Sequence, residues 1–350
     1  MRGGVAPSVD TSAFRAVRKS RKSVQGIRTP KTRCRGRRSG VGGLAVKPFK
    51  IAGLVAASDI ELPGLLLAED DASADVVIRS GVIPEVLDGA VACGPTWQLS
   101  GETLLLEIPD VARFLICGGR EIVYQPLGRC EASDLTVFLA GPAMALLLEL
   151  GGRTVFRASA VEVNGKAVLF CGPSGSGKST LAAALAQRGY RVLLDDVCAP
   201  SLGSPPLVQP DAAWLKLWSH AIGRLGAEPR RGARVRQGLG KHYLDPGHVL
   251  AGPTPVGAVY NLGETRPPLV SGITSTNSVD AVLLVRRSGY HPLLARKLDR
   301  NALYFQAAAA IAHSAGVFHL TRPFDFDALP ETMEMLERHW SEIGLLEAAA

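Results

Sequence analysis

The nine residues Gly172–Thr180, which read G-P-S-G-S-G-K-S-T, limit the fold of this chain more than any other stretch. An apolar run, 167–171, precedes them, and a strong helix-forming run, 181–187, follows them. The expected context is therefore a strand, a glycine-rich loop and a helix, as a phosphate-binding loop requires. A plain glycine turn that caps a helix would need neither a lysine nor a hydroxyl in these positions.

The residue types of this loop suit a nucleoside triphosphate. Its glycines let backbone N–H groups turn toward a polyphosphate, and the new helix adds unpaired N–H groups. We expect Lys178 to reach the β- and γ-phosphates and the Ser179 hydroxyl to bind Mg²⁺. The predicted cofactors are ATP and Mg²⁺, although the pattern does not separate ATP from GTP. The nucleotide-binding residues are expected to be Gly172, Pro173, Ser174, Gly175, Ser176, Gly177, Lys178, Ser179 and Thr180.

The positive charge of the chain is concentrated at its N-terminal end. Residues 1–50 contain 14 Lys and Arg against one acid, whereas the rest of the chain contains 25 basic and 31 acidic side chains. The overall charge therefore predicts no nucleic-acid partner. Residues 1–46 also lack hydrophobic periodicity. A disordered basic tail, an Arg-rich transit sequence and a misassigned upstream start all remain open for them.

Cysteine spacing and hydropathy indicate the compartment. The six cysteines show no C-x-x-C spacing, which is typical of isolated thiols in a reducing environment. The longest apolar run, 137–150, is too short to span a bilayer and contains Gly141-Pro142. The start of the chain also lacks the apolar core of a signal peptide. We expect a cytoplasmic protein without a membrane partner.

Residues 47–136 carry the signals of strands. Ala74–Arg79 is a short β-branched run, and Trp97–Ile108 and Ala112–Tyr124 each hold two apolar runs around a glycine turn. These patterns predict hairpins, and hence a small, mostly antiparallel β domain before a catalytic domain at 137–350. Packing alone would explain the β domain; presentation of a peptide or protein substrate is the functional alternative.

A second hairpin leads into the phosphate loop. Asn164-Gly165 stands between two apolar runs, 154–163 and 166–171, and Asn-Gly in this position is a strong hairpin signal. Counting outward from a two-residue turn places Arg157 opposite Gly172, beside the loop. An ordinary charge at the sheet edge is the alternative interpretation of Arg157.

Two adjacent acids follow one helix after the loop. Tyr190–Leu194 is expected to be a short strand that closes on Asp195-Asp196. In open α/β sheets ligands sit at the carboxyl ends of strands, so these carboxylates would lie beside the γ-phosphate. One acid could serve Mg²⁺ and the other could accept the proton of an attacking hydroxyl. A turn with two solvated acids remains the alternative.

The remaining segments carry weaker signals. We expect a helix at Ala212–Leu225, a strand at Val279–Val285, and helices at Asp134–Leu150, Arg300–Ala315 and Leu329–Ala348. A basic cluster could stabilise transferring phosphate, dock a substrate or simply be solvated; its members are Arg230, Arg231, Arg234, Arg236 and Lys241.

The run from Arg157 to Thr180, followed by R-G-Y-R-V-L-L-D-D, resembles the catalytic domain of HPr kinase/phosphorylase. It is more similar still to the HPr-kinase-like proteins found beside lasso-peptide biosynthesis genes, some of which phosphorylate a precursor peptide on a C-terminal serine. This resemblance covers about 40 residues closely. It implies a P-loop kinase domain of the HPr kinase/PEP carboxykinase-like type.

Carried over by position, the resemblance implies roles for single residues. Lys178 and Arg157 would be catalytic, and Ser179 would serve Mg²⁺ together with one of Asp195 and Asp196, for which we assign Asp195. The other acid would be the base for a serine hydroxyl. HPr enzymes usually have a histidine where this chain has Arg157, which argues against the reverse, phosphorylase reaction because a guanidinium cannot shuttle protons. The later catalytic arginine of that family cannot be assigned to one position here.

The resulting hypothesis is an ATP- and Mg²⁺-dependent serine kinase that acts on a peptide or small protein. The acceptor that we expect is a lasso-type, ribosomally made precursor peptide. The alternatives are an HPr serine kinase of carbon-metabolism control and a nucleotide-binding scaffold without phosphotransfer. An ABC-type ATPase would require L-S-G-G-Q and a downstream Asp-Glu, and neither follows the loop. Assembly into a homo-oligomer stays open.

Overall fold

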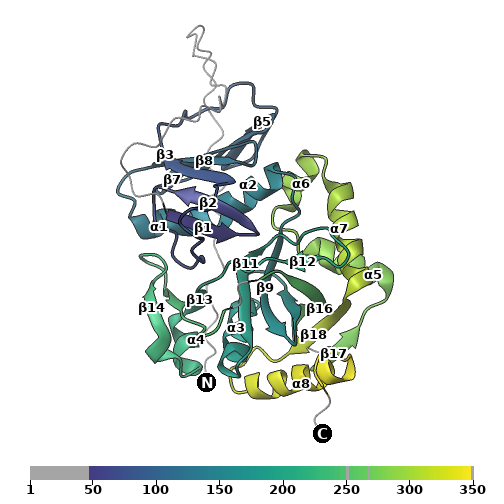
Figure 1. Ribbon diagram of the computed structural model, residues 1–350. Helices are drawn as coiled ribbons and strands as arrows, with labels where there is room; N and C mark the ends of the chain where they lie inside the picture. Colours follow the sequence, from purple (N-terminus) through teal and green to yellow (C-terminus); the bar gives the residue numbers. More distant parts are fainter. Residues whose placement is uncertain (1–46, 250–251, 267, 348–350) are drawn as a thin grey trace. The chain divides into compact units, whose positions relative to one another are not determined.

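The computed structural model describes residues 47–249, 252–266 and 268–347. The basic segment predicted at 1–46 lies outside the described residues. Within them the chain forms an eight-stranded, a seven-stranded and a three-stranded sheet together with helices (Figure 1). The expected mixed α/β class is therefore confirmed.

The eight-stranded sheet has the order β1-β2-β3-β8-β7-β6-β5-β4. Both glycine-turn hairpins are confirmed, since β5 pairs with β6 and β7 with β8 in antiparallel fashion. Two neighbouring pairs, β2–β3 and β3–β8, are parallel, so the sheet is mostly but not wholly antiparallel. Its strands are β1 Lys47–Ile51, β2 Leu54–Ser58, β3 Val76–Ser80, β4 Ala92–Cys93, β5 Trp97–Ser100, β6 Thr103–Ile108, β7 Ala112–Cys117 and β8 Glu121–Pro126.

A helical stretch covers one face of this sheet. It consists of α1 Ala132–Phe138, the π-helical turn η2 Leu139–Ala143, which contains Pro142, and α2 Met144–Leu150. The predicted helix with a Gly-Pro irregularity is therefore confirmed. Its apolar side chains lie in one hydrophobic cluster with those of strands β6 to β8. The domain boundary expected between residues 136 and 137 stays a prediction. On length and composition alone the stretch could cross a membrane, but 72% of its apolar window is buried inside the protein.

The seven-stranded sheet has the order β11-β9-β10-β16-β18-β17, with β12 paired to β16. Strands β10, β16 and β18 are mutually parallel, and β9 returns antiparallel between β10 and β11. The carboxyl ends of β10, β11, β16 and β18 therefore meet at one edge. The strands are β9 Phe156–Val163, β10 Lys166–Cys171, β11 Arg191–Cys198, β12 Leu207–Val208, β16 Thr254–Glu264, β17 Gly272–Ser275 and β18 Gly316–Arg322.

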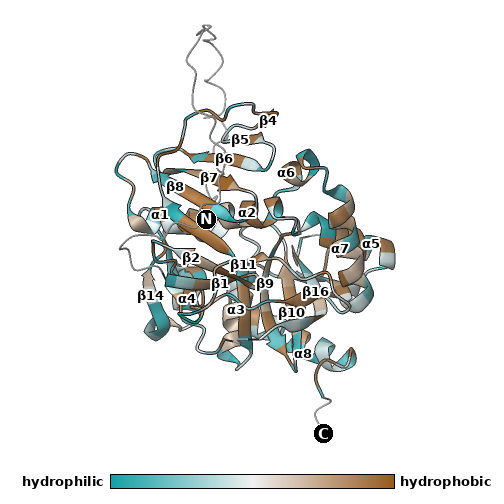
Figure 2. Ribbon diagram, turned by 45° about the horizontal axis from the view of Figure 1, so that its top comes forward, coloured by the Kyte–Doolittle hydropathy of each residue, from teal (hydrophilic) through white to brown (hydrophobic). Residues whose placement is uncertain are grey.

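Helices pack on both faces of this sheet, where the central strands carry the most hydrophobic residues (Figure 2). Helices α3 Lys178–Gln187 and α8 Leu329–Glu342 cover one face, and α5 Ser278–Arg287 and α7 Asn301–Ser314 cover the other. The remaining helices are α4 Ser219–Arg224, which packs on the three-stranded sheet, η3 Glu228–Arg230 and α6 Pro292–Lys297. The two expected C-terminal helices are present as α7 and α8. The second is shorter than predicted, because Gly344 adopts a left-handed conformation (φ 71°) just beyond its end.

Three sequence expectations are wrong in detail. Val279–Val285 lies in helix α5, because Asn277 caps the helix by accepting hydrogen bonds from two backbone N–H groups. The first half of Ala212–Leu225 is strand β13, Leu215–Trp218, in which buried and outward side chains alternate. Strand β11 does not end at the acid pair but continues through it to Cys198.

The three-stranded sheet places β15 Lys241–Leu244 between β13 and β14 Arg231–Arg234. Leu215 and Leu217 of β13 are buried in the cluster that also holds helix α3. The other face of β13 presents Lys216 and Trp218 toward the loop that follows β10.

Candidate active site

The glycine-rich loop joins β10 to α3, so the expected strand, loop and helix are all present. Gly175 and Gly177 adopt left-handed conformations, with φ of 86° and 81°. Gly177 forms the N-cap of α3 without any side-chain cap, which leaves backbone N–H groups of the first turn for an anion. The Lys178 Nζ donates to the Gly172 and Pro173 carbonyls at 2.9 and 2.8 Å, folding the lysine into the loop. Burial lowers the pKa of Lys178, against the opposing effect of the nearby acids.

Asp195 is fixed by three donors. Its Oδ1 accepts hydrogen bonds from the Ser179 and Ser159 hydroxyls, both at 2.7 Å, and its Oδ2 accepts from the Lys216 backbone N–H at 3.2 Å. The pairing of β11 with β9 sets this arrangement, because Asp195 lies directly opposite Ser159. The carboxylate is thus held against the first turn of α3.

Asp196 belongs to a different set of contacts. It has a left-handed backbone (φ 82°), which is rare for a residue other than glycine. The Tyr290 hydroxyl donates to Asp196 Oδ2 at 3.0 Å, and Arg157 Nη1 lies 3.7 Å from Asp196 Oδ1. The two acids therefore occupy distinct environments.

Arg157 lies where the hairpin register predicted it. Strand pairing runs from Lys166 opposite Val163 to Cys171 opposite Ala158, so the next position brings Arg157 opposite Gly172. The guanidinium stacks on the Tyr290 ring, with Cζ 3.9 Å from the ring centroid. Tyr290 is held there because its backbone N–H donates to the Val155 carbonyl.

Arg322 is a site residue that the sequence did not indicate. It ends β18, the strand whose carboxyl end lies at the same edge as the loop, and it is only 5% exposed. Its Nη2 donates to the Ser176 carbonyl at 3.0 Å, while Nε finds no partner among the described residues. Burial lowers the pKa of this guanidinium. An arginine at the end of a strand could have indicated it, but the sequence analysis predicts no strand at Gly316–Arg322.

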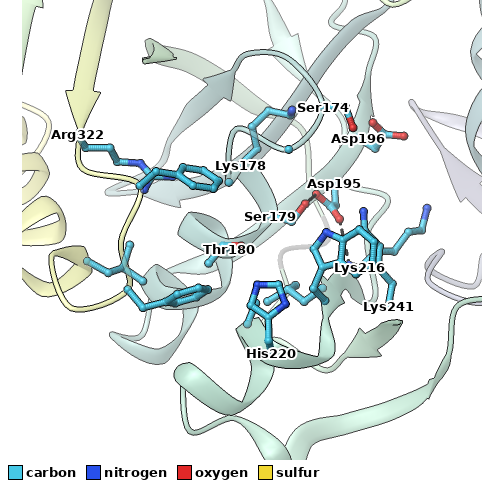
Figure 3. A pocket seen from close by; sticks show the side chains of 18 of the residues that line it. Ser174, Lys178, Ser179, Thr180, Asp195, Asp196, Lys216, His220, Lys241 and Arg322 are labelled. Carbon is cyan, nitrogen blue, oxygen red and sulfur yellow. Dashed lines mark hydrogen bonds between the residues drawn. The ribbon is translucent and has the colours of Figure 1, made fainter. Parts of the chain in front are cut away.

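These groups line one cleft of about 340 Å³. Figure 3 shows Ser179 and Asp195 near its centre, Arg322 on one side, and Lys216 and Lys241 on the opposite side. Every loop residue from Ser174 to Thr180 except Ser176 lines the cleft, as do Asp195, Asp196 and Arg157. Of the predicted nucleotide-binding residues, Gly172, Pro173 and Ser176 do not line it. The structure adds Lys216 and Arg322 to the lining, and it adds Ser159 and Tyr290 as hydrogen-bond partners of the two acids.

The donor set fits a magnesium ion bound together with a triphosphate. Mg²⁺ prefers oxygen ligands and usually binds through one or two protein groups plus phosphate oxygens and water. The Ser179 hydroxyl and the Asp195 carboxylate, 2.7 Å apart, supply such a pair. Within the described residues no cluster of three His, Cys, Asp or Glu side chains forms an all-protein metal cage.

No protein-family model matches the chain, and no curated protein sequence matches it either. Among solved structures, the chain is similar to the Hpr(Ser) kinase/phosphatase from Coxiella burnetii, with 15% sequence identity and a TM-score of 0.30. The match covers 55% of this chain and 99% of that chain. A likeness this distant carries no argument about activity.

Proposed function

We propose that this chain is a cytoplasmic ATP- and Mg²⁺-dependent serine kinase that acts on a peptide or small protein. The observation that carries the proposal is the separation of the two adjacent acids. Asp195 Oδ1 accepts a hydrogen bond from the Ser179 hydroxyl of the phosphate loop, whereas Asp196 contacts Tyr290 and Arg157. This division suits one acid to the metal and the other to the proton of an acceptor.

The environment of each acid supports a specific role. Asp195 already accepts three hydrogen bonds and contacts Ser179, so we assign these two residues to Mg²⁺. When bound, Mg²⁺ would supply charge neutralisation on the phosphates. Asp196 accepts fewer hydrogen bonds and faces the cleft, so we assign it as the general base.

In the proposed reaction the serine oxygen attacks the γ-phosphorus of ATP, and the bond from this phosphorus to the ADP oxygen breaks. Asp196 accepts the hydroxyl proton as the new bond forms. Lys178 and Arg157 neutralise negative charge on the transferring group. Little covalent chemistry is required of the protein, so positioning accounts for most of the rate.

The acceptor we propose is a lasso-type, ribosomally made precursor peptide with a C-terminal serine. The support for this choice is that the run Arg157–Asp196 resembles the HPr-kinase-like proteins found beside lasso-peptide biosynthesis genes. The experiment is mass spectrometry of such a peptide after incubation with the protein, ATP and Mg²⁺, beside a parallel reaction with HPr.

We expect one added phosphate on the peptide serine, and loss of that product in Asp196→Asn and in Lys178→Ala. Both variants should retain the wild-type circular dichroism spectrum. Phosphate on HPr alone would replace the proposed acceptor with HPr. Tight ATP binding with no phosphate on either acceptor would leave a nucleotide-dependent scaffold and refute the kinase.

A further inference from the structure

We infer that the sheet face formed by Lys216, Trp218 and Lys241 is the docking surface for an acidic segment of the acceptor peptide. This inference rests on the proposed kinase function and adds the chemical class of its substrate. The face belongs to β13 and β15 and forms one wall of the cleft.

Strand geometry places the three side chains together. Lys216 and Trp218 are two residues apart in β13 and so point to the same face, while Lys241 lies directly opposite Trp218 in β15. The Lys241 Nζ lies 5.2 Å from the centroid of the Trp218 ring, and 43% of Trp218 is exposed. The result is an accessible aromatic ring with Lys241 over it and Lys216 two residues away on the same face.

The positive charge of this face is not neutralised as it is elsewhere in the basic cluster. Arg231 pairs with Glu228 and Arg236 pairs with Asp134. In contrast, neither Lys216 nor Lys241 lies within 4 Å of a carboxylate among the described residues, and Lys216 acts only at longer range, on the buried Asp211. A surface with unpaired cations beside an exposed aromatic ring favours carboxylate groups.

Strand β14 carries its cations on the opposite face of this sheet. Arg234 pairs with His242 of β15, and His242 is adjacent to Lys241, so the two β15 side chains point to opposite faces. Burial, together with Arg231 and Arg234, lowers the pKa of His242. An acidic segment on the face of Lys216 and Lys241 would therefore meet the cations of β13 and β15.

The face also begins at the reacting groups. The Lys216 backbone N–H donates to Asp195, which fixes the start of β13 against the acid pair. Figure 3 shows Lys216 and Lys241 on the side of the cleft opposite Arg322. A peptide whose serine reaches Asp196 would lay its flanking residues along this wall, so the preferred acceptor has Asp or Glu near the serine.

The test uses three synthetic peptides with one serine each, flanked by Glu, Gln or Lys. We expect kcat/KM for the Glu peptide to exceed that for the Gln peptide roughly tenfold, since an exposed ion pair to each of the two lysines contributes about threefold. The Lys peptide should be the poorest substrate. In Lys241→Glu the order of the Glu and Lys peptides should reverse, while the KM for ATP stays unchanged. Lys297→Glu, the same charge change on exposed helix α6, should keep the wild-type order.

A second readout separates this inference from the proposed kinase function. Fluorescence anisotropy should detect binding of the labelled Glu peptide to protein loaded with a non-hydrolysable ATP analogue, weakening as salt rises. Equal phosphorylation of the Glu and Gln peptides would refute the docking surface and leave the kinase standing. Salt-sensitive Glu-peptide binding without transfer to any peptide would refute the kinase and support the surface. A rise in the KM for ATP in Lys241→Glu would assign the cations to the nucleotide and overturn the inference, as would absence of both binding and transfer.

Discussion

Two glycines of the phosphate loop provide a matched test of the contact between the loop and Arg322. Gly175 and Gly177 both adopt left-handed conformations, with φ of 86° and 81°. A Cβ atom on Gly177 would lie 2.4 Å from the Arg322 Nη2, whereas one on Gly175 would meet no atom within 4 Å. Alanine at either position therefore imposes a similar backbone strain, but only Gly177→Ala displaces the buried guanidinium.

The expected magnitudes follow from these two contributions. An L-residue in the left-handed region costs about 1–2 kcal/mol, and this applies to both variants. Displacing Arg322 also breaks its hydrogen bond to the Ser176 carbonyl. A hydrogen bond from a charged donor contributes about 1.5–3 kcal/mol, so Gly177→Ala should be destabilised by about that much more than Gly175→Ala.

The assay is urea unfolding of both variants without nucleotide, so that no ligand contact contributes. A double-mutant cycle provides the control: in an Arg322→Ala background, the cost of Gly177→Ala should fall to that of Gly175→Ala. Equal free energies of unfolding for the two single variants would refute the reasoning. A cost for Gly177→Ala that persists in the Arg322→Ala background would do the same.

Two further outcomes are expected. Tyr290→Phe removes the hydrogen bond to Asp196, so kcat should fall roughly tenfold or more with the KM for ATP unchanged, as measured by steady-state phosphorylation; an unchanged kcat would remove Tyr290 from the positioning of the base. Burial raises the pKa of Asp211 from 3.8 to about 7, so the folded state binds this proton more tightly than the unfolded chain. This contribution to the free energy of unfolding is present below the unfolded pKa and is lost as pH rises through 7. Urea unfolding should therefore show a larger loss of stability from pH 5 to pH 8 in wild type than in Asp211→Asn. Equal losses would contradict the raised pKa of Asp211.

Local signals were sufficient to predict the core of the site. The loop Gly172–Thr180 and the Asn164-Gly165 turn each specify their own geometry through nearby residues, and together they fixed the position of Arg157 before any long-range pairing was known. The acid pair was placed correctly beside the loop. The predicted strand is shorter than β11, because nothing in the sequence indicates that β11 continues through the two acids and pairs with β9 there.

The residues that the sequence missed all depend on contacts between distant segments. Ser159 contacts Asp195 only because β9 pairs with β11, and Tyr290 reaches Asp196 only because the end of α5 returns to the start of β9. Lys216 was assigned to a helix because Ala212–Leu225 mixes apolar and polar residues at helical spacing as well as at alternating spacing. The pairing of β13 with β15 decides between the two patterns, and no local signal encodes it.

The position of Arg157 has a consequence for the direction of the proposed reaction. A guanidinium stays charged at any physiological pH, so the stack of Arg157 on Tyr290 can attract phosphate but cannot accept a proton. The Tyr290 hydroxyl cannot accept it either at neutral pH, because burial and the nearby Asp196 raise the pKa of this tyrosine. Of the three side chains in this set, Asp196 alone can take the proton of an acceptor hydroxyl. The set is therefore suited to forward transfer from ATP, and removing the Asp196 carboxylate should leave nucleotide binding while ending the chemical step.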